Sequence, residues 1–399
     1  MIGTAVYEVE LRLNGKLIGN IRELAQNLTW SKKRTRIGVD SISFTLNDQL
    51  FAKWCAMRGV TVADMLCPLA LDCRVVRNGV PVVGGYLATM PAYQANGTSA
   101  SLSLSFDGYI NYLANVYLDP YDSYNGKMGD VIKRWITIAD DRATGYGKAF
   151  GFKVGNIADM AVIQESFDGW KAIKDAITDR CDNVTGAGMF EVYFHPDRTY
   201  DVIKESDFGE EITDYIVQYP AQLNGVSALE LNAGEISGFA SRVDAIGSEQ
   251  AEWAYSINRD AVKKYGYAEK MLQESSITVF ETLRNTAQTE VSNTSNLEWQ
   301  PQIKLSGNQV APIPNGERKI WIGDTIKLQN NIDPIGMMSG EFRVNSLEVS
   351  VEATGAETIT PTLSRSEAIN TSSFIKDFAR MRNNLLAVGS SRTSVNMVE

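Results

Sequence analysis

The sequence predicts a mainly β fold with an α+β insertion, made of two barrel-like β domains with a small α/β domain between them in the sequence, a helical insertion and a helical tail. Two observations predict the β domains. Apolar residues recur at every second position in short segments, which is typical of strands with one buried face, and Gly-containing turns separate these segments. A third observation predicts the other parts: apolar residues at helical spacing appear at 131–138 and again at 277–291.

Residues 1–117 are predicted to form the first β domain. Alternating apolar residues lead into Asn14-Gly15, and a second such run leads into Asn78-Gly79; both dipeptides are typical of tight hairpin turns. Only residues 49–66 interrupt the strands, with the composition of one short helix. Closely spaced strands with Gly turns indicate a barrel or a sandwich.

Residues 118–214 are predicted to form a small α/β domain. A helix is expected around 131–138 and a second across 166–177, capped by Ser166 or Asp168. The side chains predicted to share the buried face of this second helix are Trp170, Ile173 and Ile177. A hairpin at 190–202 follows, and its turn contains the chain's single histidine, His195, which we expect at the surface.

Residues 215–365 are predicted to form the second β domain, interrupted by a helical insertion at about 253–296. Strands are expected at 241–247, 302–305, 319–322, 325–328 and 342–351. A turn is expected at Ile322-Gly323-Asp324, and the apolar alternation changes parity between Val344 and Leu347, as one extra residue in a β-bulge would cause.

Residues 366–399 form the tail. Five apolar residues follow one another there at steps of four, three, four and three, which is heptad spacing over two heptads. They are Phe374, Phe378, Met381, Leu385 and Val388. This stripe is predicted to pack on the chain's own β domain, or alternatively to dock onto other copies or onto another protein.

A basic cluster lies between Trp30 and the strand at Ile42. Its members are Lys32, Lys33, Arg34 and Arg36. We predict that these four side chains, with Phe374, Phe378, Met381 and Leu385 of the tail, form assembly interfaces. The alternative for the basic cluster is a solvated loop.

Composition excludes some classes of protein. The net charge is −10, with eleven Lys and Arg against eight Asp and Glu in residues 1–117 and 27 against 40 in the remainder. An acidic chain is a poor binder of nucleic acid, because that affinity comes largely from neutralising phosphates. No apolar run is long enough to span a membrane, and no signal peptide is expected. The four cysteines include no C-x-x-C pair, so we expect reduced thiols in a chain made in a cytoplasm.

The chain contains no recognisable catalytic motif, so we predict a protein that is not an enzyme, with no catalytic, cofactor-binding or metal-binding residues. A P-loop, a nucleophile elbow and a zinc-protease pair are all missing from the sequence. The adjacent carboxylates Asp140-Asp141 and Glu210-Glu211 are expected in solvated loops. The acidic run from Asp119 to Asp130 lacks the spacing of an EF-hand.

The order of these parts resembles the baseplate-hub, or tail-associated, proteins of bacteriophage tails. Three stretches carry the resemblance: the segment 166–173 with the hairpin at 190–202, the segment 242–247 with Tyr265-Gly266 and the helix at 277–291, and the segment 320–328 with Phe342-Arg343-Val344.

The resemblance implies two tube-like β-barrels, a peripheral α/β domain and a helical insertion. It also implies a homotrimeric ring in the virion, at the tail tip or baseplate, that joins the tail tube to the tip or receptor-binding proteins. DNA would be only passing cargo. Two alternatives are a tail-associated cell-wall hydrolase and a carbohydrate-binding adhesin.

Overall fold

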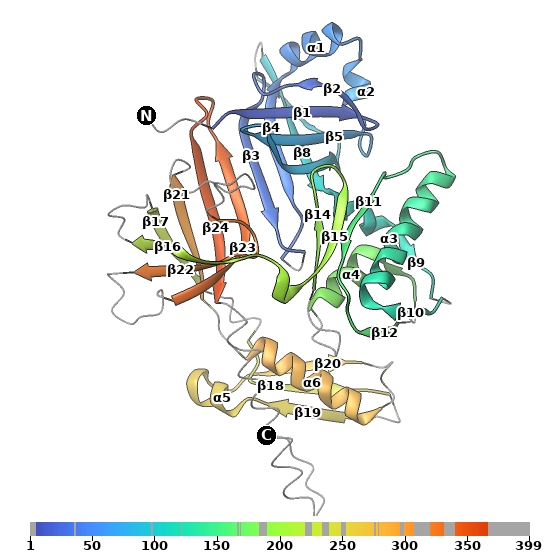
Figure 1. Ribbon diagram of the computed structural model, residues 1–399, viewed down its shortest axis with the longest axis vertical. Coiled ribbons are helices and arrows are strands. Elements are labelled where there is room, and N and C mark those ends of the chain that lie inside the picture. The colour runs from blue at the N-terminus through green and yellow to red at the C-terminus, as the bar shows by residue number, and fades with distance from the viewer. Residues whose placement is uncertain are drawn as a thin grey trace, which may run out of the picture. The chain divides into compact units, whose positions relative to one another are not determined.

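Strand pairing organises most of the chain in the computed structural model, where 14 strands form one sheet in the order β17-β21-β24-β23-β3-β4-β8-β6-β5-β1-β2, with β16, β22 and β7 attached beside this path (Figure 1). The structure describes residues 5–35, 37–96, 99–120, 122–165, 167, 169–182, 190–219, 226–233, 239–248, 253–274, 277, 279–295, 299–306, 320–330 and 340–365. The chain divides into two compact units, Met1–Glu230 with Pro301–Leu363, and Leu231–Gln300 with Ser364–Glu399. The predicted mainly β class is confirmed.

The N-terminal part of the large sheet contains eight strands. They are β1 (Tyr7–Leu13), β2 (Lys16–Asn20), β3 (Gln26–Lys33), β4 (Ser41–Asn47), β5 (Leu71–Arg77), β6 (Val80–Leu87), β7 (Ala92–Asn96) and β8 (Ser99–Gly108). Two helices, α1 (Asp48–Met57) and α2 (Val62–Met65), interrupt them where the sequence predicts one. A capping box at Thr61 starts the second helix separately: the Thr61 hydroxyl accepts from the Asp64 amide, and the Asp64 carboxylate accepts from the Thr61 amide.

Both predicted Asn-Gly hairpins are confirmed. Asn14-Gly15 joins β1 to β2 with φ of 50° and 80°, and Asn78-Gly79 joins β5 to β6 with φ of 50° and 81°. Asn and Gly tolerate these left-handed angles, and their twist matches that of the two strands they connect. The sequence therefore determines these two turns locally, while the register of each hairpin shifts further along its strands, between Leu11 and Arg12 and between Val75 and Val76.

The α/β part follows. Its elements are η1 (Tyr109–Asn115), β9 (Tyr117–Leu118), β10 (Tyr124–Lys127), α3 (Met128–Gly145), β11 (Lys153–Ile157), β12 (Val162–Glu165), β13 (Lys171–Ala172), α4 (Ile173–Asp182), β14 (Phe190–Phe194), β15 (Thr199–Lys204) and η2 (Glu205–Asp207). The helix predicted across 166–177 begins only at Ile173, because Lys171 and Ala172 pair with β9. Trp170 thus lies outside the helix and is 62% exposed, whereas Ile173 and Ile177 are fully buried as predicted.

The C-terminal part of the large sheet contains β16 (Glu211–Tyr219), β17 (Val226–Ala233), β21 (Trp299–Ser306), β22 (Thr325–Asn330), β23 (Gly340–Val351) and β24 (Glu357–Arg365). Of the strand predicted at 319–322, residues 320–322 are not in a strand; they lead into the predicted turn, where Gly323 has φ +87°. The pairing of β23 with β22 covers residues 340–343 and its pairing with β3 covers residues 346–351, so the bulge predicted between Val344 and Leu347 stays a prediction. Where the alternation changes, the polar residues Arg343 and Asn345 are buried along with their apolar neighbours.

Strand β3 joins the two parts of the large sheet. It pairs antiparallel with β4 along one edge and with β23 along the other, from Lys33 opposite Ser346 to Leu28 opposite Val351. Since both edges of β3 are occupied, β3 cannot also pair with β2 to close the N-terminal strands. Among the described residues no strands close into a barrel, so the prediction of two barrels is corrected to two regions of one open sheet.

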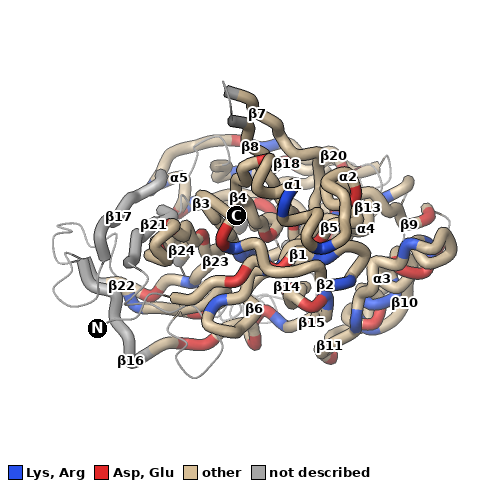
Figure 2. The backbone as a smooth tube through the Cα atoms, turned by 90° about the horizontal axis from the view of Figure 1, so that it is seen from above, with Lys and Arg blue, Asp and Glu red and all other residues tan. Residues whose placement is uncertain are grey.

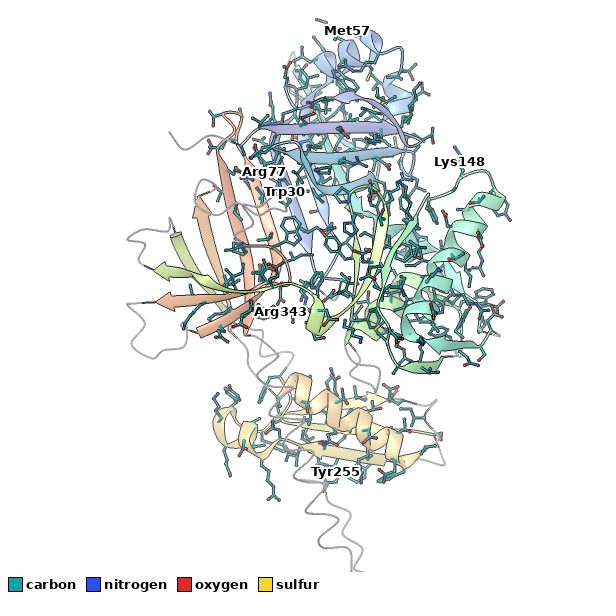
Figure 3. All side chains as sticks on the ribbon, in the orientation of Figure 1. Trp30, Met57, Arg77, Lys148, Tyr255 and Arg343 are labelled. Carbon is teal, nitrogen blue, oxygen red and sulfur yellow. The ribbon has the colours of Figure 1, made fainter. Side chains whose placement is uncertain are left out.

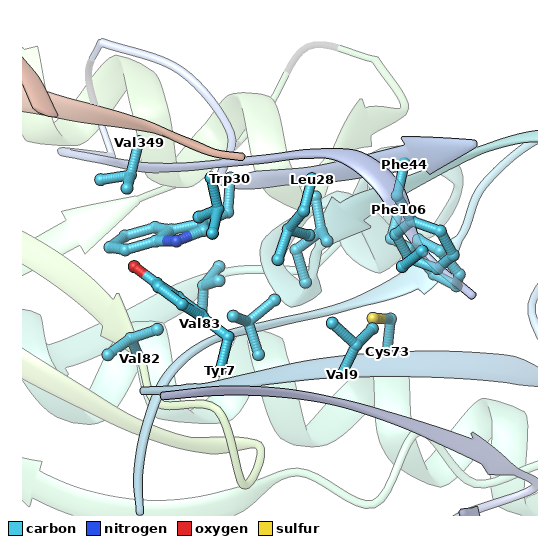
Figure 4. Close-up of a cluster of buried hydrophobic side chains, with 14 of the residues drawn as sticks. Tyr7, Val9, Leu28, Trp30, Phe44, Cys73, Val82, Val83, Phe106 and Val349 are labelled. Atoms are coloured by element: carbon cyan, nitrogen blue, oxygen red, sulfur yellow. The ribbon is translucent and has the colours of Figure 1, made fainter. Parts of the chain in front are cut away.

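A single apolar core extends across this junction. Trp30 of β3 is fully buried between Val349 of β23 and Tyr7 of β1, and Phe44 stacks on Phe106 at 5.7 Å between ring centroids (Figure 4). Aromatic side chains of this size dominate the apolar area that a core buries. The core thus holds residues from both ends of the sequence together.

The second unit is a small α/β layer. Its elements are β18 (Arg242–Ile246), β19 (Trp253–Ile257), α5 (Arg259–Tyr265), β20 (Glu269–Gln273) and α6 (Phe280–Thr294), and its sheet has the order β19-β18-β20. The predicted insertion at about 253–296 therefore contains strands as well as helices. The strand expected at 241–247 in the second β domain pairs instead with β19 and β20.

Candidate functional site

The basic segment at the end of β3 lies where the two regions of the sheet meet the α/β part. Lys32 is 2% exposed, and its Nζ donates to Asp40 Oδ2 at 2.6 Å and to the Phe194 carbonyl at 2.7 Å. The same Nζ lies 4.3 Å from the centroid of the Tyr193 ring. Burial by itself lowers the pKa of Lys32, but the Asp40 carboxylate and Tyr193 outweigh burial and raise that pKa above its usual value. Lys32 is therefore a charged, fully bonded part of the interior.

Arg34 connects three separate segments of the chain. It is 1% exposed, and its Nε donates to Glu191 Oε1 of β14 at 2.7 Å. Its Nη1 donates to Asn345 Oδ1 of β23 at 3.2 Å, and its Nη2 binds the carboxylate of Glu205 in η2. A planar guanidinium suits this role, because its donors diverge in fixed directions.

Glu191 and Glu205 are held by further bonds at the same junction. The Thr35 amide donates to Glu191 Oε2 at 2.9 Å, and Thr35 Oγ1 donates to the Val192 carbonyl at 2.7 Å. Arg343 Nη1 lies 2.8 Å from Glu205 Oε1, and Arg343 Nε donates to the Gly323 carbonyl at 3.1 Å (Figure 3). We call the set Lys32, Arg34, Asp40, Glu191, Glu205 and Arg343 the ionic junction.

The ionic junction leaves almost no free space. A cavity of about 20 Å³ lies among residues of the basic segment and of β14. Such a volume holds a single water molecule. The junction therefore has the properties of a structural joint and no room for a substrate.

A second buried ion pair fastens β24 to the N-terminal strands. Arg77 donates to Glu357 through Nε at 2.8 Å and Nη2 at 2.6 Å, and the Tyr7 hydroxyl donates to Glu357 Oε2 at 2.6 Å. Burial and the Glu357 charge raise the pKa of Tyr7 far above its usual value, so this hydroxyl remains a donor. Bidentate pairing of this kind fixes both distance and orientation.

The turn between β14 and β15 docks onto the N-terminal strands. Arg74 Nε donates to the Pro196 carbonyl at 3.1 Å, and Arg198 Nη2 binds the buried carboxylate of Asp72. Gly84 makes the close approach possible, since a Cβ there would lie 2.9 Å from the Pro196 oxygen. The α/β part is thus attached through both the tip and the side of its hairpin.

The structure places the residues of the predicted assembly interfaces in different environments. The solvated-loop alternative is wrong for Lys32 and Arg34, which bond to acceptors of their own chain. The Lys33 side chain is partly exposed, so the predicted assembly contact stays a prediction with Lys33 as its accessible member. Arg36, Phe374, Phe378, Met381 and Leu385 lie outside the described residues.

Sequence reasoning missed the acidic and polar partners of the basic cluster. Asp40, Glu191, Glu205 and Asn345 lie up to about 310 positions away from it, and each resembles an ordinary surface residue in its local context. One indication was present: Arg343 lies between Phe342 and Val344, where both neighbours are apolar and a charged side chain needs a buried partner.

The described residues offer little for catalysis or metal binding. No group of three or more His, Cys, Asp or Glu that could hold a metal ion occurs among them. His195 is partly exposed in its turn, as predicted, and its Nε2 lies 2.7 Å from Asp201 Oδ2. The carboxylates of Glu191 and Glu205 both pair with the buried guanidinium of Arg34.

An open groove of about 450 Å³ lies on the α/β part. Its lining residues are Asn115, Val116, Tyr117, Arg142 and Trp170. Tyr117 and Trp170 are 45% and 62% exposed. Arg142 Nη1 donates to the Tyr117 carbonyl at 2.5 Å, which fixes the guanidinium beside the groove.

In the described chain, charged residues are not gathered into a patch of one sign. Basic and acidic residues are interspersed along the described chain (Figure 2). None of the described helices is both long enough and apolar enough to cross a bilayer.

Solved structures share this fold. A tail protein from Neisseria meningitidis MC58 is 13% identical, with a TM-score of 0.59 over 90% of this chain and 97% of that chain. The 43 kDa tail protein of prophage MuSo2 from Shewanella oneidensis is 14% identical, with a TM-score of 0.59 over 90% and 98%. Prophage tail protein gp18 from Listeria monocytogenes EGD-e is 11% identical, with a TM-score of 0.52 over 94% and 99%.

No protein-family model matches the chain, and no curated protein matches its sequence. The similarity to the three tail proteins nevertheless extends over almost the whole of each. The chain therefore has the fold of phage tail proteins, and the resemblance predicted from its sequence is confirmed at the level of fold.

Proposed function

We propose that this chain is a structural virion protein, the hub at the distal end of a phage tail tube, joining the tube to the tip or receptor-binding proteins. The similarity of fold to tail proteins over 90% of the chain carries the proposal. Its partners would be other copies in a trimeric ring and neighbouring tail proteins, with DNA only passing through. The proposal keeps the domain division predicted from the sequence as its working outline.

The buried ion pairs support a structural role. The ionic junction and the Arg77–Glu357 pair connect β3, β14, β23 and β24, which lie far apart in sequence. Buried, hydrogen-bonded pairs of this kind define one geometry, because each alternative arrangement leaves a charge unpaired. A hub that transmits force between a tube and a tip needs such fixed geometry.

Labelling of assembled particles tests the location. A tagged copy of this chain, detected by gold-conjugated antibody, should appear at the distal end of the tube in electron micrographs. Particles that carry no label, or that carry it along the whole tube, would contradict the proposal. Light scattering at high protein concentration should show threefold association, and a chain that stays monomeric there and in particle maps contradicts the ring.

Charge reversal tests the assembly contact predicted for the basic cluster. Lys33→Glu changes a partly exposed side chain, and we expect a folded protein that no longer attaches to the tail. Lys32→Glu is the matched contrast, because it places a carboxylate beside Asp40 in the interior and should unfold the chain. Normal attachment of a folded Lys33→Glu protein would remove this residue from the interface.

One observation favours a second candidate, carbohydrate binding. Exposed aromatic rings beside a fixed guanidinium, as in the Tyr117–Trp170 groove, offer both a stacking surface and hydrogen-bond donors to a sugar. Glycan arrays with the intact protein and with Trp170→Ala would decide this. Binding that the substitution abolishes supports the second candidate, and absence of any bound glycan contradicts it.

A further inference from the structure

The groove on the α/β part combines exposed aromatic rings with polar groups that have no partner among the described residues. Its volume is about 450 Å³, which is within the range of small-molecule sites in proteins. Its lining residues are Asn115, Val116, Tyr117, Arg142 and Trp170. If this groove binds carbohydrate, as the second candidate function states, these side chains also determine which class of sugar fits.

Hydrogen bonds hold the backbone of the groove in place. Tyr117 of β9 pairs with Ala172 of β13. The amide of Ile173, the first residue of α4, donates to the Val116 carbonyl at 2.8 Å. The Arg142 guanidinium, in the last turn of α3, donates to the Tyr117 carbonyl. Two consecutive carbonyls are thus bonded to the start of α4 and to the end of α3, so the groove is formed before a ligand binds.

Both aromatic rings of the groove are available for stacking. Tyr117 and Trp170 are 45% and 62% exposed, and neither ring contacts another ring in the described chain. A sugar ring presents a face of C–H groups, and the negatively polarised face of an aromatic ring attracts such groups. The two rings therefore offer a stacking surface for a sugar.

The Arg142 guanidinium supplies a charge that no described residue neutralises. Its Nη1 donates to the Tyr117 carbonyl, whereas its Nε and Nη2 have no acceptor among the described residues. The Arg142 side chain is exposed, and no acidic side chain lines the groove. An anionic group that enters the groove therefore finds one unpaired positive charge.

The free edge of this guanidinium has the geometry of a carboxylate site. Nε and Nη2 lie on one edge of the plane, and their two N–H bonds match the two oxygens of a carboxylate. The same two atoms bind both oxygens of Glu357 in Arg77 and both oxygens of Asp244 in Arg242. In Arg142 this edge is turned to no described acceptor.

The other groups of the groove narrow the class of ligand. The Asn115 side chain is exposed and has no hydrogen-bond partner among the described residues, so it can bond a hydroxyl group. An apolar peptide would leave Asn115 and Arg142 without partners, which costs binding free energy. A nucleic acid would need several cations along its phosphates, and the groove provides one.

We propose that the groove binds an acidic saccharide, a sugar that carries a carboxylate. The sugar ring packs against Trp170 and Tyr117, and the carboxylate accepts from Nε and Nη2 of Arg142. Asn115 bonds a hydroxyl of the same saccharide. Uronic acids and sialic acids are the two sources of this chemistry.

Paired glycans test the class of ligand. An array carries uronic-acid and sialic-acid oligosaccharides, each beside a carboxyl-reduced counterpart in which CH₂OH replaces the carboxylate. The intact protein should bind at least one acidic member about tenfold more tightly than its neutral counterpart, because reduction removes the charge-assisted pair. The family of glycans that gives this difference identifies the source.

Variants of the intact protein test the location. Arg142→Gln should remove the preference for the acidic member, and Trp170→Ala should weaken the binding of both members. Lys133→Gln is the matched control: it removes the same charge from an exposed side chain of α3 and should change neither affinity.

A further variant separates the ligand contact from the bond to the Tyr117 carbonyl. Arg142→Lys keeps the charge and loses the planar fork, so the preference for the acidic member should fall without disappearing. Thermal unfolding of each variant verifies that it is folded. If Arg142→Gln does not fold, the comparison of Arg142→Lys with Lys133→Gln decides.

Three results overturn the proposal. Equal binding of acidic and neutral members rejects the acidic class and leaves carbohydrate binding in place. A preference unchanged by substitution of Arg142, or an affinity unchanged by Trp170→Ala, places the binding outside the groove. Absence of binding to every glycan contradicts carbohydrate binding and the proposal together, while the hub role keeps its own test in particle labelling.

Discussion

The Arg77–Glu357 pair allows a quantitative test of how the two regions of the sheet are held together. Arg77→Met keeps most of the side-chain volume and removes the charge. Glu357, whose side chain is 2% exposed, would then remain with the Tyr7 hydroxyl as its partner. Leaving one member of a buried pair uncompensated costs roughly 3–5 kcal/mol, so we expect the free energy of unfolding of the large unit to fall by that amount.

Urea unfolding followed by circular dichroism measures the effect. If the free energy of unfolding falls by about 3 kcal/mol per molar urea, the urea concentration at the unfolding midpoint should fall by roughly 1 M or more. Arg12→Met is the control, because Arg12 pairs with Glu10 at 3.0 Å near the surface, and such pairs contribute only about 0–1 kcal/mol.

Removing the whole group should restore stability. In Tyr7→Phe/Arg77→Met/Glu357→Leu no buried charge or hydroxyl of the cluster remains, and apolar replacement of a buried pair is commonly neutral or stabilising. We expect this triple variant to unfold near the midpoint of the unmodified chain. The reasoning is refuted if Arg77→Met is no worse than Arg12→Met, or if the triple variant is no better than Arg77→Met.

Two further predictions concern packing and pH. Gly84→Ala should lower the free energy of unfolding, measured by thermal unfolding, by about 1–3 kcal/mol, because the added Cβ would lie 2.9 Å from the Pro196 oxygen. Gly145→Ala, whose Cβ would have nothing within 4 Å, should be neutral or slightly stabilising. Equal effects of the two substitutions would contradict the docked turn. Burial raises the pKa of Tyr200 from 10.0 to about 12, so its contribution to stability is present below pH 10 and is lost as the pH rises to about 12. The Tyr200 hydroxyl has no hydrogen-bond partner in the described chain, so Tyr200→Phe should leave the free energy of unfolding at neutral pH unchanged. The same substitution should reduce the loss of stability between pH 10 and pH 12, measured by urea unfolding. An unchanged loss over this pH range would contradict the prediction.

Local features of the fold were predictable from the sequence, and long-range pairing was not. The Asn14-Gly15 and Asn78-Gly79 turns depend on backbone angles that those residues themselves favour, so their hairpins follow from the sequence. Trp170 has the spacing of a helical face, but pairing of the adjacent Lys171 with β9 starts the helix later. Competition between a local pattern and a distant strand cannot be resolved from spacing alone.

The candidate site shows the same limit. The basic cluster was recognisable as a group, yet burial of Arg34 depends on Glu191, Glu205 and Asn345, whose proximity is created by the fold. A charged residue in a loop-like context resembles a solvated one until its partners are known. The sequence therefore located the basic cluster but did not predict that its side chains form buried ion pairs.

The pairing of β3 with β23 has a consequence for synthesis. Lys33 pairs with Ser346, so about 310 residues must be translated after β3 before its second edge has a partner. At 5–20 residues per second this takes roughly 15 to 60 s. During that interval the strand presents free amide and carbonyl groups next to Trp30, a surface that can bind a chaperone or pair with a neighbouring nascent chain. Slower translation of codons 34–346 should therefore increase aggregation of this protein more than slower translation of the codons after 351.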